Sequence, residues 1–400
     1  MDYQQSRAYV KDADRYAGGA LDLTNIKELM KRLGNPQDQL KYVHVAGTNG
    51  KGSVIAYLYT TLSEAGYRVG RYISPSVYSY REKMEVAGSA VSREQFAGYV
   101  TRVAAAIKEM TTEGLAHPTP FEIETAVAFL FFAEEKCDLV ILEVGMGGNL
   151  DATNIIRNTV LAVLVPISMD HQAFLGNTLS EIAEKKAGII KPGCSVVTVG
   201  QQPETMAVIE RVCRENGADL TEADLHEAKA VKEDFAGQTL EYRGENYELA
   251  LAGSYQTEYA ALALEALEVL GRVGYPTTVE QRKKGLKDTK WNGRLTIIHR
   301  EPLFIVDGAH NPAAADMLED SVRKYFKGRK LFFIMGVFRD KDYPYIIRKL
   351  CPYAEQIITI ETPDNPRALP AQELAEEVKK CNPHVQAADS ITDAVDKIFA

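Results

Sequence analysis

The chain has 400 residues, of which 46% are hydrophobic and 25% are charged, and its formal net charge is −9. These proportions are typical of a globular protein, so they exclude a disordered chain, a collagen and a coiled coil, and the length predicts two or three domains. The acidic balance argues against nucleic acid as the main partner.

The sequence also argues against a membrane or secreted location. No apolar run approaches the roughly 18–20 residues that a membrane span needs. The first residues, MDYQQSRAYV, lack the apolar core of a signal peptide. The five cysteines are scattered without a C-x-x-C pair, which is typical of reduced thiols. We therefore expect a cytoplasmic protein that binds neither membranes nor nucleic acid.

Short apolar strands alternate with amphipathic helices from the first strand onward. The pattern predicts strands at 41–46, 69–74, 139–144 and 159–165, and helices at 53–65 and 121–136. Such alternation favours a mainly parallel sheet covered by helices. Residues 239–250 instead alternate around Gly244, which predicts a hairpin.

The same rhythm restarts after Trp291. It predicts strands at 303–307, 330–335 and 356–360, a helix at 312–325, a helix that ends at 350, and two final helices. About a hundred residues of this kind suit a small doubly wound domain.

The most informative stretch lies between the first predicted strand and helix: Gly47-Thr48-Asn49-Gly50-Lys51-Gly52-Ser53. Glycines there let backbone N–H groups converge on phosphate oxygens at the N-terminus of the helix. Lys51 can reach the β- and γ-phosphates, and the Ser53 hydroxyl can bind Mg²⁺. The alternative is a structural turn, but Lys51 and Ser53 stand where nucleotide binding needs them.

These patterns predict an α/β protein with two domains. We expect a P-loop NTPase-like, mainly parallel sheet domain at residues 1–294, followed by a smaller Rossmann-like α/β domain at residues 295–400.

Further polar residues follow predicted strands. Glu143 ends a buried strand at the edge where α/β proteins bind ligands, so it is a candidate Mg²⁺ ligand or a capping or salt-bridged glutamate. Asp307 and His310 stand between a strand and a helix that opens at Pro312, which suits nucleotide contact or a simple N-cap cluster.

The spelling G-T-N-G-K-G-S, with Gly52 between Lys51 and Ser53, resembles the nucleotide loop of the Mur ligase superfamily. It is most similar to the folate branch, the folylpolyglutamate synthases and dihydrofolate synthases. Other family-like segments follow in order: L-G-N-P at 33–36, S-P at 74–75, F-E at 121–122, E-V-G-M-G-G at 143–148, L-D-A-T-N at 150–154, D-H at 170–171, E-K-K-A-G-I at 184–189, W-N-G-R at 291–294, D-G-A-H-N-P at 307–312 and D-K-D at 340–342.

The resemblance implies an ATP-dependent amide ligase. Such an enzyme activates a carboxylate as an acyl phosphate and transfers the acyl group to the amine of L-glutamate. The acceptor would be a folate or dihydropteroate, the cofactors ATP and Mg²⁺, with K⁺ as a further suggested cation, and we expect a monomer.

The resemblance also assigns roles to individual residues. Catalysis falls to Lys51, Glu143, His171 and Lys186, with Lys186 carbamylated by CO₂ and with Ser53, Glu143 and His171 as metal ligands. ATP binding falls to the loop from Gly47 to Ser53 and to Gln256, Arg294, Asp307 and His310. Substrate binding falls to Ser74, Phe121, Asp151 and Thr153. Without the resemblance, His171 would be read as a structural histidine, and Lys185 and Lys186 as a surface pair.

Four positions depart from the family pattern. Ser76 and Tyr255 stand in place of histidine, Asn149 in place of arginine and Tyr259 in place of asparagine. These segments face substrate or adenine in the family, whereas the magnesium and phosphate residues are intact. A shifted pterin preference, or the loss of one of two activities, is therefore a hypothesis.

Two alternatives stay open. A peptidoglycan-precursor ligase of the same superfamily usually carries a further N-terminal domain, and a phosphate loop beginning at Gly47 leaves little room for one. A nucleotide-binding regulator without ligase activity would turn over nucleotide independently of glutamate and pterins.

Overall fold

The structure is a computed structural model that describes residues 1–16, 22–235 and 237–399. The chain forms two compact units. The first contains Met1–Val231, Thr239–Ala250 and Thr257–Trp291, and the second contains Lys232–Gln238, Leu251–Gln256 and Asn292–Ala400.

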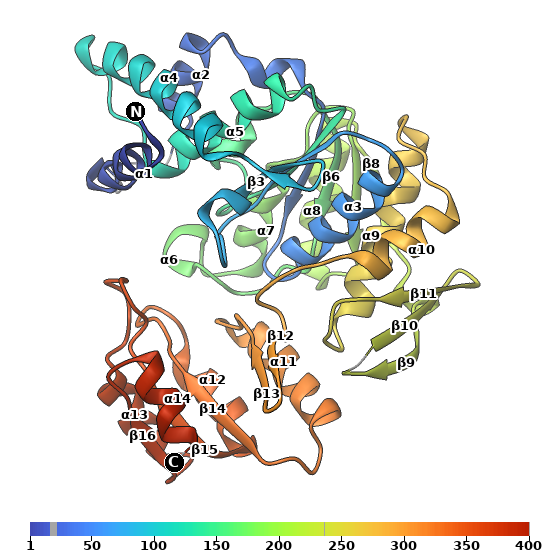
Figure 1. The fold of residues 1–400 in the computed structure, drawn as a ribbon. Helices are drawn as coiled ribbons and strands as arrows, with labels where there is room; N and C mark the ends of the chain where they lie inside the picture. The colour runs from blue at the N-terminus through green and yellow to red at the C-terminus, as the bar shows by residue number, and fades with distance from the viewer. Residues whose placement is uncertain (17–21, 236, 400) are drawn as a thin grey trace. The chain divides into compact units, whose positions relative to one another are not determined.

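An eight-stranded sheet lies at the centre of the first unit (Figure 1), with the strand order β4-β3-β2-β5-β1-β6-β7-β8. The parallel strands are β1 (Tyr42–Ala46), β2 (Val69–Tyr72), β5 (Leu139–Glu143), β6 (Thr159–Leu164), β7 (Ser195–Val199) and β8 (Asp219–Ala223). At one edge, β3 (Met84–Val86) and β4 (Ser89–Ala90) pair antiparallel. Because β1 lies between β5 and β6, the loop that follows it leaves the middle of the sheet.

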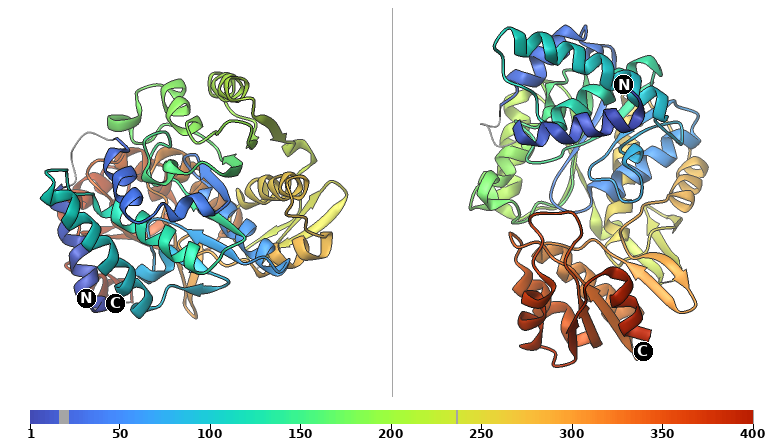
Figure 2. Two further views of the ribbon diagram at one scale, coloured as in Figure 1. Left: turned by 90° about the horizontal axis from the view of Figure 1, so that it is seen from above. Right: turned by 60° about the vertical axis from the view of Figure 1, so that its left-hand side comes forward.

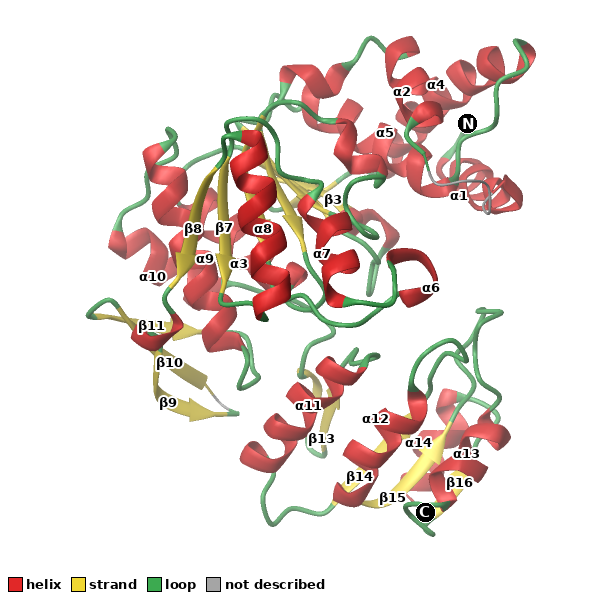
Figure 3. Cartoon of the chain, turned by 180° about the vertical axis from the view of Figure 1, so that it is seen from behind, coloured by secondary structure: helices red, strands yellow, loops and turns green. Residues whose placement is uncertain are grey.

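Helices cover both faces of this sheet. Helix α3 (Lys51–Glu64) lies on one face beside α10 (Val279–Asp288), and α7 (Leu179–Ala187) and α8 (Pro203–Asn216) lie on the other (Figures 1 and 3). The central strands are therefore buried on both faces, which explains why their sequences are continuous apolar runs.

Helices from the N-terminal part of the chain lie together (Figure 2), and an apolar cluster lies among them. These helices are α1 (Tyr3–Asp12), α2 (Thr24–Arg32), α4 (Arg93–Thr112) and α5 (Pro120–Glu134). Helix α5 begins at a capping box in which the Thr119 and Glu122 side chains each bond to the other residue's backbone N–H. This start places Phe121 in the first turn, where it packs against the cluster.

The second unit contains a parallel sheet of β14 (Leu331–Met335), β15 (Ala354–Thr359) and β16 (Val385–Ala387). Its helices are α11 (Pro312–Tyr325), α12 (Tyr343–Leu350), α13 (Ala371–Lys379) and α14 (Ile391–Phe399). An antiparallel ribbon of β12 (Thr296–Arg300) and β13 (Leu303–Val306) comes first in the chain.

A small sheet in the order β11-β10-β9 and helix α9 (Gln256–Arg272) precede this ribbon. Its strands are β9 (Lys229–Asp234), β10 (Gly237–Tyr242) and β11 (Glu245–Leu249).

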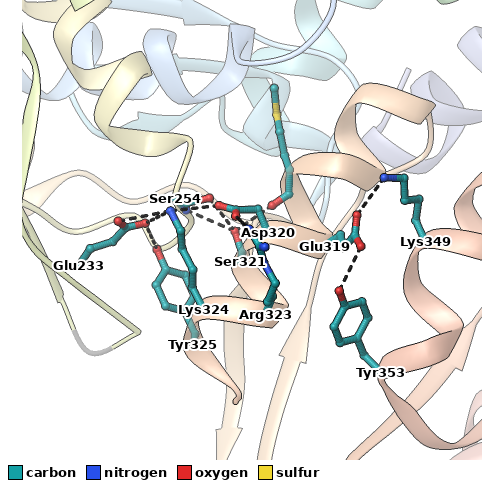
Figure 4. A network of polar contacts seen from close by, with 11 residues as sticks. Glu233, Ser254, Glu319, Asp320, Ser321, Arg323, Lys324, Tyr325, Lys349 and Tyr353 are labelled. Carbon is teal, nitrogen blue, oxygen red and sulfur yellow. Dashed lines mark hydrogen bonds and ion pairs between the residues drawn. The ribbon is translucent and has the colours of Figure 1, made fainter. Parts of the chain in front are cut away.

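A polar network attaches two separate segments to α11 in the second unit (Figure 4). Lys324 Nζ lies 3.1 Å from both Glu233 Oε1 and Asp320 Oδ2, and the Ser254 N–H donates to Ser321 Oγ at 3.3 Å. These bonds explain why residues 232–238 and 251–256 belong to the second unit.

The structure confirms the predicted α/β fold with its mainly parallel sheet. The hairpin predicted at 239–250 is present as β10 and β11, but β9 adds a third strand. The pattern does not predict β9, β12 or β16, because these strands are short or exposed and lack a continuous apolar run. In the described part of the chain, no helix combines the length and hydropathy that a membrane span requires.

Candidate active site

The loop between β1 and α3 holds the predicted nucleotide-binding residues. Gly47 and Gly50 have φ values of 141° and 103°, in the left-handed region that favours glycine. A Cβ on Gly47 would also lie 2.2 Å from Val165 Cγ2. No side chain caps α3 at Gly50, and the first-turn N–H groups of a helix are suited to bind an anion.

Thr48 ties this loop to the segment that follows β6. Its backbone N–H donates to the Pro166 carbonyl at 2.9 Å, and its hydroxyl donates to the Ser168 carbonyl at 3.1 Å. The Ser168 N–H in turn donates to the Thr48 hydroxyl at 3.0 Å. These bonds join the loop to the segment that follows β6.

Two lysine side chains meet at the Gly47 carbonyl. Lys51 Nζ donates to this oxygen at 3.3 Å and to the Thr48 carbonyl at 3.2 Å, and Lys186 Nζ donates to it at 2.7 Å. Lys186 comes from the last turn of α7, and its exposed fraction is 5%. Burial, with a smaller contribution from Lys51, lowers the pKa of Lys186 to about 7.

The neighbouring Lys185 is half-buried, and its backbone carbonyl accepts a hydrogen bond from the Asn149 N–H at 2.8 Å. The structure thus distinguishes two adjacent lysines that the sequence alone does not. Lys186 is the one that faces the phosphate loop, and at neutral pH a substantial fraction of its amine is uncharged.

Glu143 lies at the edge of the sheet beside the same loop. It ends β5, pairs in register with Val45 of β1, and has an exposed fraction of 6%. Its Oε2 accepts a hydrogen bond from the Ser74 N–H at 3.1 Å, which brings the predicted substrate residue Ser74 to this edge.

The donor chemistry of Ser53 and Glu143 fits magnesium. Both residues are buried and offer oxygen atoms, which Mg²⁺ prefers together with water and substrate phosphates. His171 precedes the short helix α6 (Gln172–Leu175), its side chain is 38% exposed, and its Nε2 lies 3.9 Å from Asp170 Oδ2. Among the described residues, no three His, Cys, Asp or Glu side chains form a metal-binding cluster.

Asp151 and Thr153 face the interior of the first unit. The Asp151 carboxylate accepts the N–H groups of Met146 at 2.9 Å and Thr153 at 3.0 Å, as well as the Thr153 hydroxyl at 2.5 Å. The Thr153 hydroxyl also lies 2.9 Å from Nε2 of His44, whose pKa burial lowers to about 3. Because Thr153 donates to Asp151, His44 donates to Thr153. These bonds hold the loop that follows β5.

Phe121 lies against the start of that loop. Its ring is half-buried and stacks on Tyr72, with centroids 6.0 Å apart and planes at 27°. A Cβ on Gly145 would lie 2.7 Å from Phe121 Cζ, so the glycine that follows Val144 makes room for the ring.

In the second unit, Arg294, Asp307 and His310 gather around one loop. The Gly293 carbonyl accepts Arg294 Nη1 at 3.0 Å and the Gly308 N–H at 2.9 Å. The Asp307 carboxylate accepts two backbone N–H groups at 2.8 and 2.9 Å, and His310 Nδ1 lies 2.8 Å from the Gly308 carbonyl. Gln256, the last of the predicted ATP-binding residues, is fully buried where α9 begins.

Two aromatic residues at the phosphate loop receive no role from the sequence. A Cβ on Gly50 would lie 2.5 Å from the ring of Tyr259, and one on Gly52 would lie 2.1 Å from the indole of Trp291. The signals in the sequence are the departure at Tyr259, the additional glycine at position 52 and the place of Trp291 at the start of the W-N-G-R segment.

Comparisons with known proteins identify the family of the chain. Residues 45–267 match the Mur ligase middle domain, and residues 293–400 match the Mur ligase glutamate ligase domain. The chain is 35% identical over 382 residues to a dihydrofolate synthase/folylpolyglutamate synthase of Bacillus subtilis, covering 93% of this chain and 88% of that protein. It is 32% identical to a folylpolyglutamate synthase of Lacticaseibacillus casei, covering 92% and 88%.

Solved structures give the same result. The folylpolyglutamate synthase of Mycobacterium tuberculosis in complex with ADP has a TM-score of 0.89 and 31% identity, and the match covers 100% of this chain and 91% of that one. A folylpolyglutamate synthase in complex with AMPPCP and folate has a TM-score of 0.83 and 29% identity, with 100% of both chains covered. The chain therefore belongs to the folylpolyglutamate synthase and dihydrofolate synthase family of Mur ligases.

Proposed function

We propose that the protein is an ATP-dependent ligase that joins L-glutamate to a folate, with dihydropteroate as a second acceptor. The observation that carries the proposal is the convergence of Lys51 and Lys186 on the Gly47 carbonyl, beside Glu143. In relatives named folylpolyglutamate synthase and dihydrofolate synthase, the matched region covers nearly the whole of this chain.

The proposed reaction has two steps. A carboxylate oxygen of the acceptor attacks the γ-phosphorus of ATP, the bond from phosphorus to the β,γ-bridging oxygen breaks, and ADP leaves. The amine of glutamate then attacks the acyl carbon, phosphate leaves with the electrons of the C–O bond, and the amine loses a proton. This chemistry depends on positioning and charge neutralisation more than on a protein nucleophile.

The residues of the loop supply those two requirements. Lys51 is free to rotate from the loop carbonyls to the phosphates, because its present bonds are only to backbone oxygens at 3.2 and 3.3 Å. The N–H groups of α3 add partial positive charge. Mg²⁺ held by Ser53, Glu143 and His171 would neutralise phosphate charge when bound.

We further propose that Lys186 is carbamylated. Its uncharged Nζ attacks the carbon of CO₂, an N–C bond forms, one C=O electron pair moves to oxygen, and the nitrogen proton passes to solvent. Burial and the lowered pKa favour the uncharged amine that this step needs. The product anion would offset the charge of Lys51 and the metal.

Replacing Lys186 with alanine tests the carbamate. We expect Lys186→Ala to lose most activity and to regain part of it with formate or acetate, because a small carboxylate can occupy the vacated position. Lys185→Ala serves as the matched control and should stay active. Full activity of Lys186→Ala without any added acid would refute the proposal.

For the acceptor, we propose that Phe121 and Ser74 lie at the pterin side of the site. Phe121 offers a half-buried aromatic ring beside Gly145, and Ser74 lies next to Glu143. Asp151 and Thr153 would act indirectly, by holding the loop that follows β5, because their polar atoms form hydrogen bonds within the protein.

We propose that four residues of the second unit contribute to ATP binding: Gln256, Arg294, Asp307 and His310. Arginine suits this role because its guanidinium can bind phosphate oxygens in pairs. We keep residues 1–294 and 295–400 as the proposed ATP-binding and glutamate ligase domains. A K⁺ requirement, a monomeric state and a cytoplasmic location stay predictions.

Mass spectrometry of the products tests the acceptor. The protein would be incubated with ATP, Mg²⁺ and L-glutamate, and with either dihydropteroate or tetrahydrofolate. We expect a product heavier by one glutamyl residue, formed at different rates from the two acceptors. Equal rates would contradict a shifted preference, and no product from either would contradict the proposed function.

A further inference from the structure

The side chain of Trp291 occupies the space in which a side chain at position 52 would lie. A Cβ on Gly52 would lie 2.1 Å from Trp291 Cζ2 and 2.5 Å from Cε2. Gly52 lies within α3 and is not among the glycines with positive φ, so its backbone would accept other residues. It is therefore the indole ring that requires glycine here.

The indole also has a partner in the sheet. The Arg71 guanidinium of β2 lies 5.7 Å from the centroid of the Trp291 ring and 4.8 Å from that of Tyr59, which lies on α3. Arg71 is buried and forms an ion pair with Glu85 of β3. The ring thus contacts the first turn of α3 and a cation that is held in the sheet.

Trp291 stands at an informative place in the chain. It is the last residue of the first unit, and Arg294 follows three residues later in the second. Gly52 separates Lys51 from Ser53, the two residues whose side chains would contact phosphate and Mg²⁺. The Trp291 ring thus packs on the backbone between Lys51 and Ser53.

We propose that Trp291 is a positioning residue for the ATP site: its indole sets the first turn of α3, and with it Lys51 and Ser53, and anchors the segment that leads to Arg294. The proposal explains the additional glycine in G-K-G-S. It rests on the proposed function, because it concerns the nucleotide site of the same ligase.

A double-mutant cycle on ATP binding tests the proposal. The dissociation constant of Mg·ATP would be measured by calorimetry, without acceptor, for wild type, Gly52→Ala, Trp291→Ala and the double variant. We expect Gly52→Ala to weaken binding about tenfold or more, because its Cβ would displace the indole or the first turn of α3. In the Trp291→Ala background the same change should be neutral, because the clash is gone and alanine favours helix.

Two control variants separate positioning from general damage. Gly285 of α10 also packs on α3, and its Cβ would lie 2.2 Å from Thr61 Oγ1, away from the loop. Gly285→Ala should lower the melting temperature and leave the ATP dissociation constant unchanged. Gly50→Ala should weaken ATP binding and not be rescued by Tyr259→Ala, because φ at Gly50 is 103° whatever its neighbour.

Trp291 is the only tryptophan of the chain, so the tryptophan fluorescence of the wild type reports on the surroundings of this side chain. Mg·ATP should change its emission saturably, with the dissociation constant found by calorimetry. An unchanged emission, wild-type binding by Gly52→Ala, or a double variant that binds Mg·ATP more weakly than Trp291→Ala alone would overturn the proposal. Because no measurement includes glutamate or a pterin, a failure of the ligase proposal would appear separately, as absent product.

Discussion

Lys51 and Lys186 donate to the same carbonyl oxygen of Gly47, at 3.3 and 2.7 Å. When Lys186 is protonated, its ammonium group and that of Lys51 repel each other, and burial of Lys186 adds a desolvation cost. In our proposal, a bound phosphate would offset these charges, and carbamylation would replace the positive charge of Lys186 with a negative one.

The cost of Lys186 can be measured as a pH dependence of stability. Its pKa is about 7 in the folded protein and 10.5 as its ordinary value, so between these values the unfolded chain binds more protons. Stability therefore rises with pH across this window. In CO₂-free buffer, we expect Lys186→Met to be more stable than wild type at pH 7 by a few kcal/mol, and this advantage to shrink by pH 10.

Urea denaturation at pH 7, 8.5 and 10 supplies the measurement. Lys185→Met is the matched control, and its free energy of unfolding should change with pH in the same way as that of the wild type. A stability advantage of Lys186→Met that stays constant over this range would show that Lys186 is charged in the folded protein at neutral pH.

At the scale of single elements, the helices differ in how their starts are capped. Helices α4 and α5 both start at capping boxes, whereas α3 starts at Gly50 without a side-chain cap. The start of α3 therefore differs from the other two in the way that our proposed phosphate site requires.

Gly98 lies in α4, and no steric contact requires glycine at this position. It is exposed, its φ is not in the left-handed region, and a Cβ there would meet no atom within 4 Å. We expect Gly98→Ala to stabilise the protein by about 0.5–1 kcal/mol, because alanine loses less backbone entropy in a helix. Chemical denaturation should show a higher midpoint with an unchanged slope. A lower midpoint would mean that the helix needs glycine for a contact absent from this structure.

The ion pairs of α11 predict a substitution that lowers stability, in contrast to Gly98→Ala. Burial raises the pKa of Asp320, but hydrogen bonds from Ser254, Arg323 and Lys324 outweigh it and lower the pKa to about 2. This stabilisation is complete above pH 3.8 and is lost as pH falls toward 2. We expect Asp320→Asn to cost about 1 kcal/mol or less at pH 7, and less at pH 3.

Thermal denaturation at pH 7 and pH 3 checks this expectation. Glu355→Gln, which removes an exposed ion pair with Lys330 at 3.1 Å, is the control and should have no measurable effect. Equal losses at both pH values would show that Asp320 does not act through its charge.

For the whole molecule, the predictable part of the fold is the part with strong periodicity. Buried parallel strands such as β5 and the helix of Phe121 are apparent from continuous apolar runs. The short strand β16 and the exposed strand β9 are stabilised by their neighbours in the sheet, and nothing local marks them.

The candidate site was predictable to a similar degree. The phosphate loop has a distinctive sequence motif, so its position can be predicted. The place of Glu143 can be predicted because it ends a buried apolar strand. Which of Lys185 and Lys186 faces the loop depends on helix orientation, and the packing of Trp291 on Gly52 joins residues 239 positions apart. Such contacts depend on tertiary structure, which a single sequence does not display.

The most direct test is ADP release from Mg·ATP in the presence of L-glutamate. Dihydropteroate, tetrahydrofolate and a muramyl nucleotide-sugar would be added in separate reactions. We predict that ADP release requires both glutamate and a pterin, as a folate ligase demands. Release that ignores every acceptor, or that depends only on the nucleotide-sugar, would contradict the proposed function.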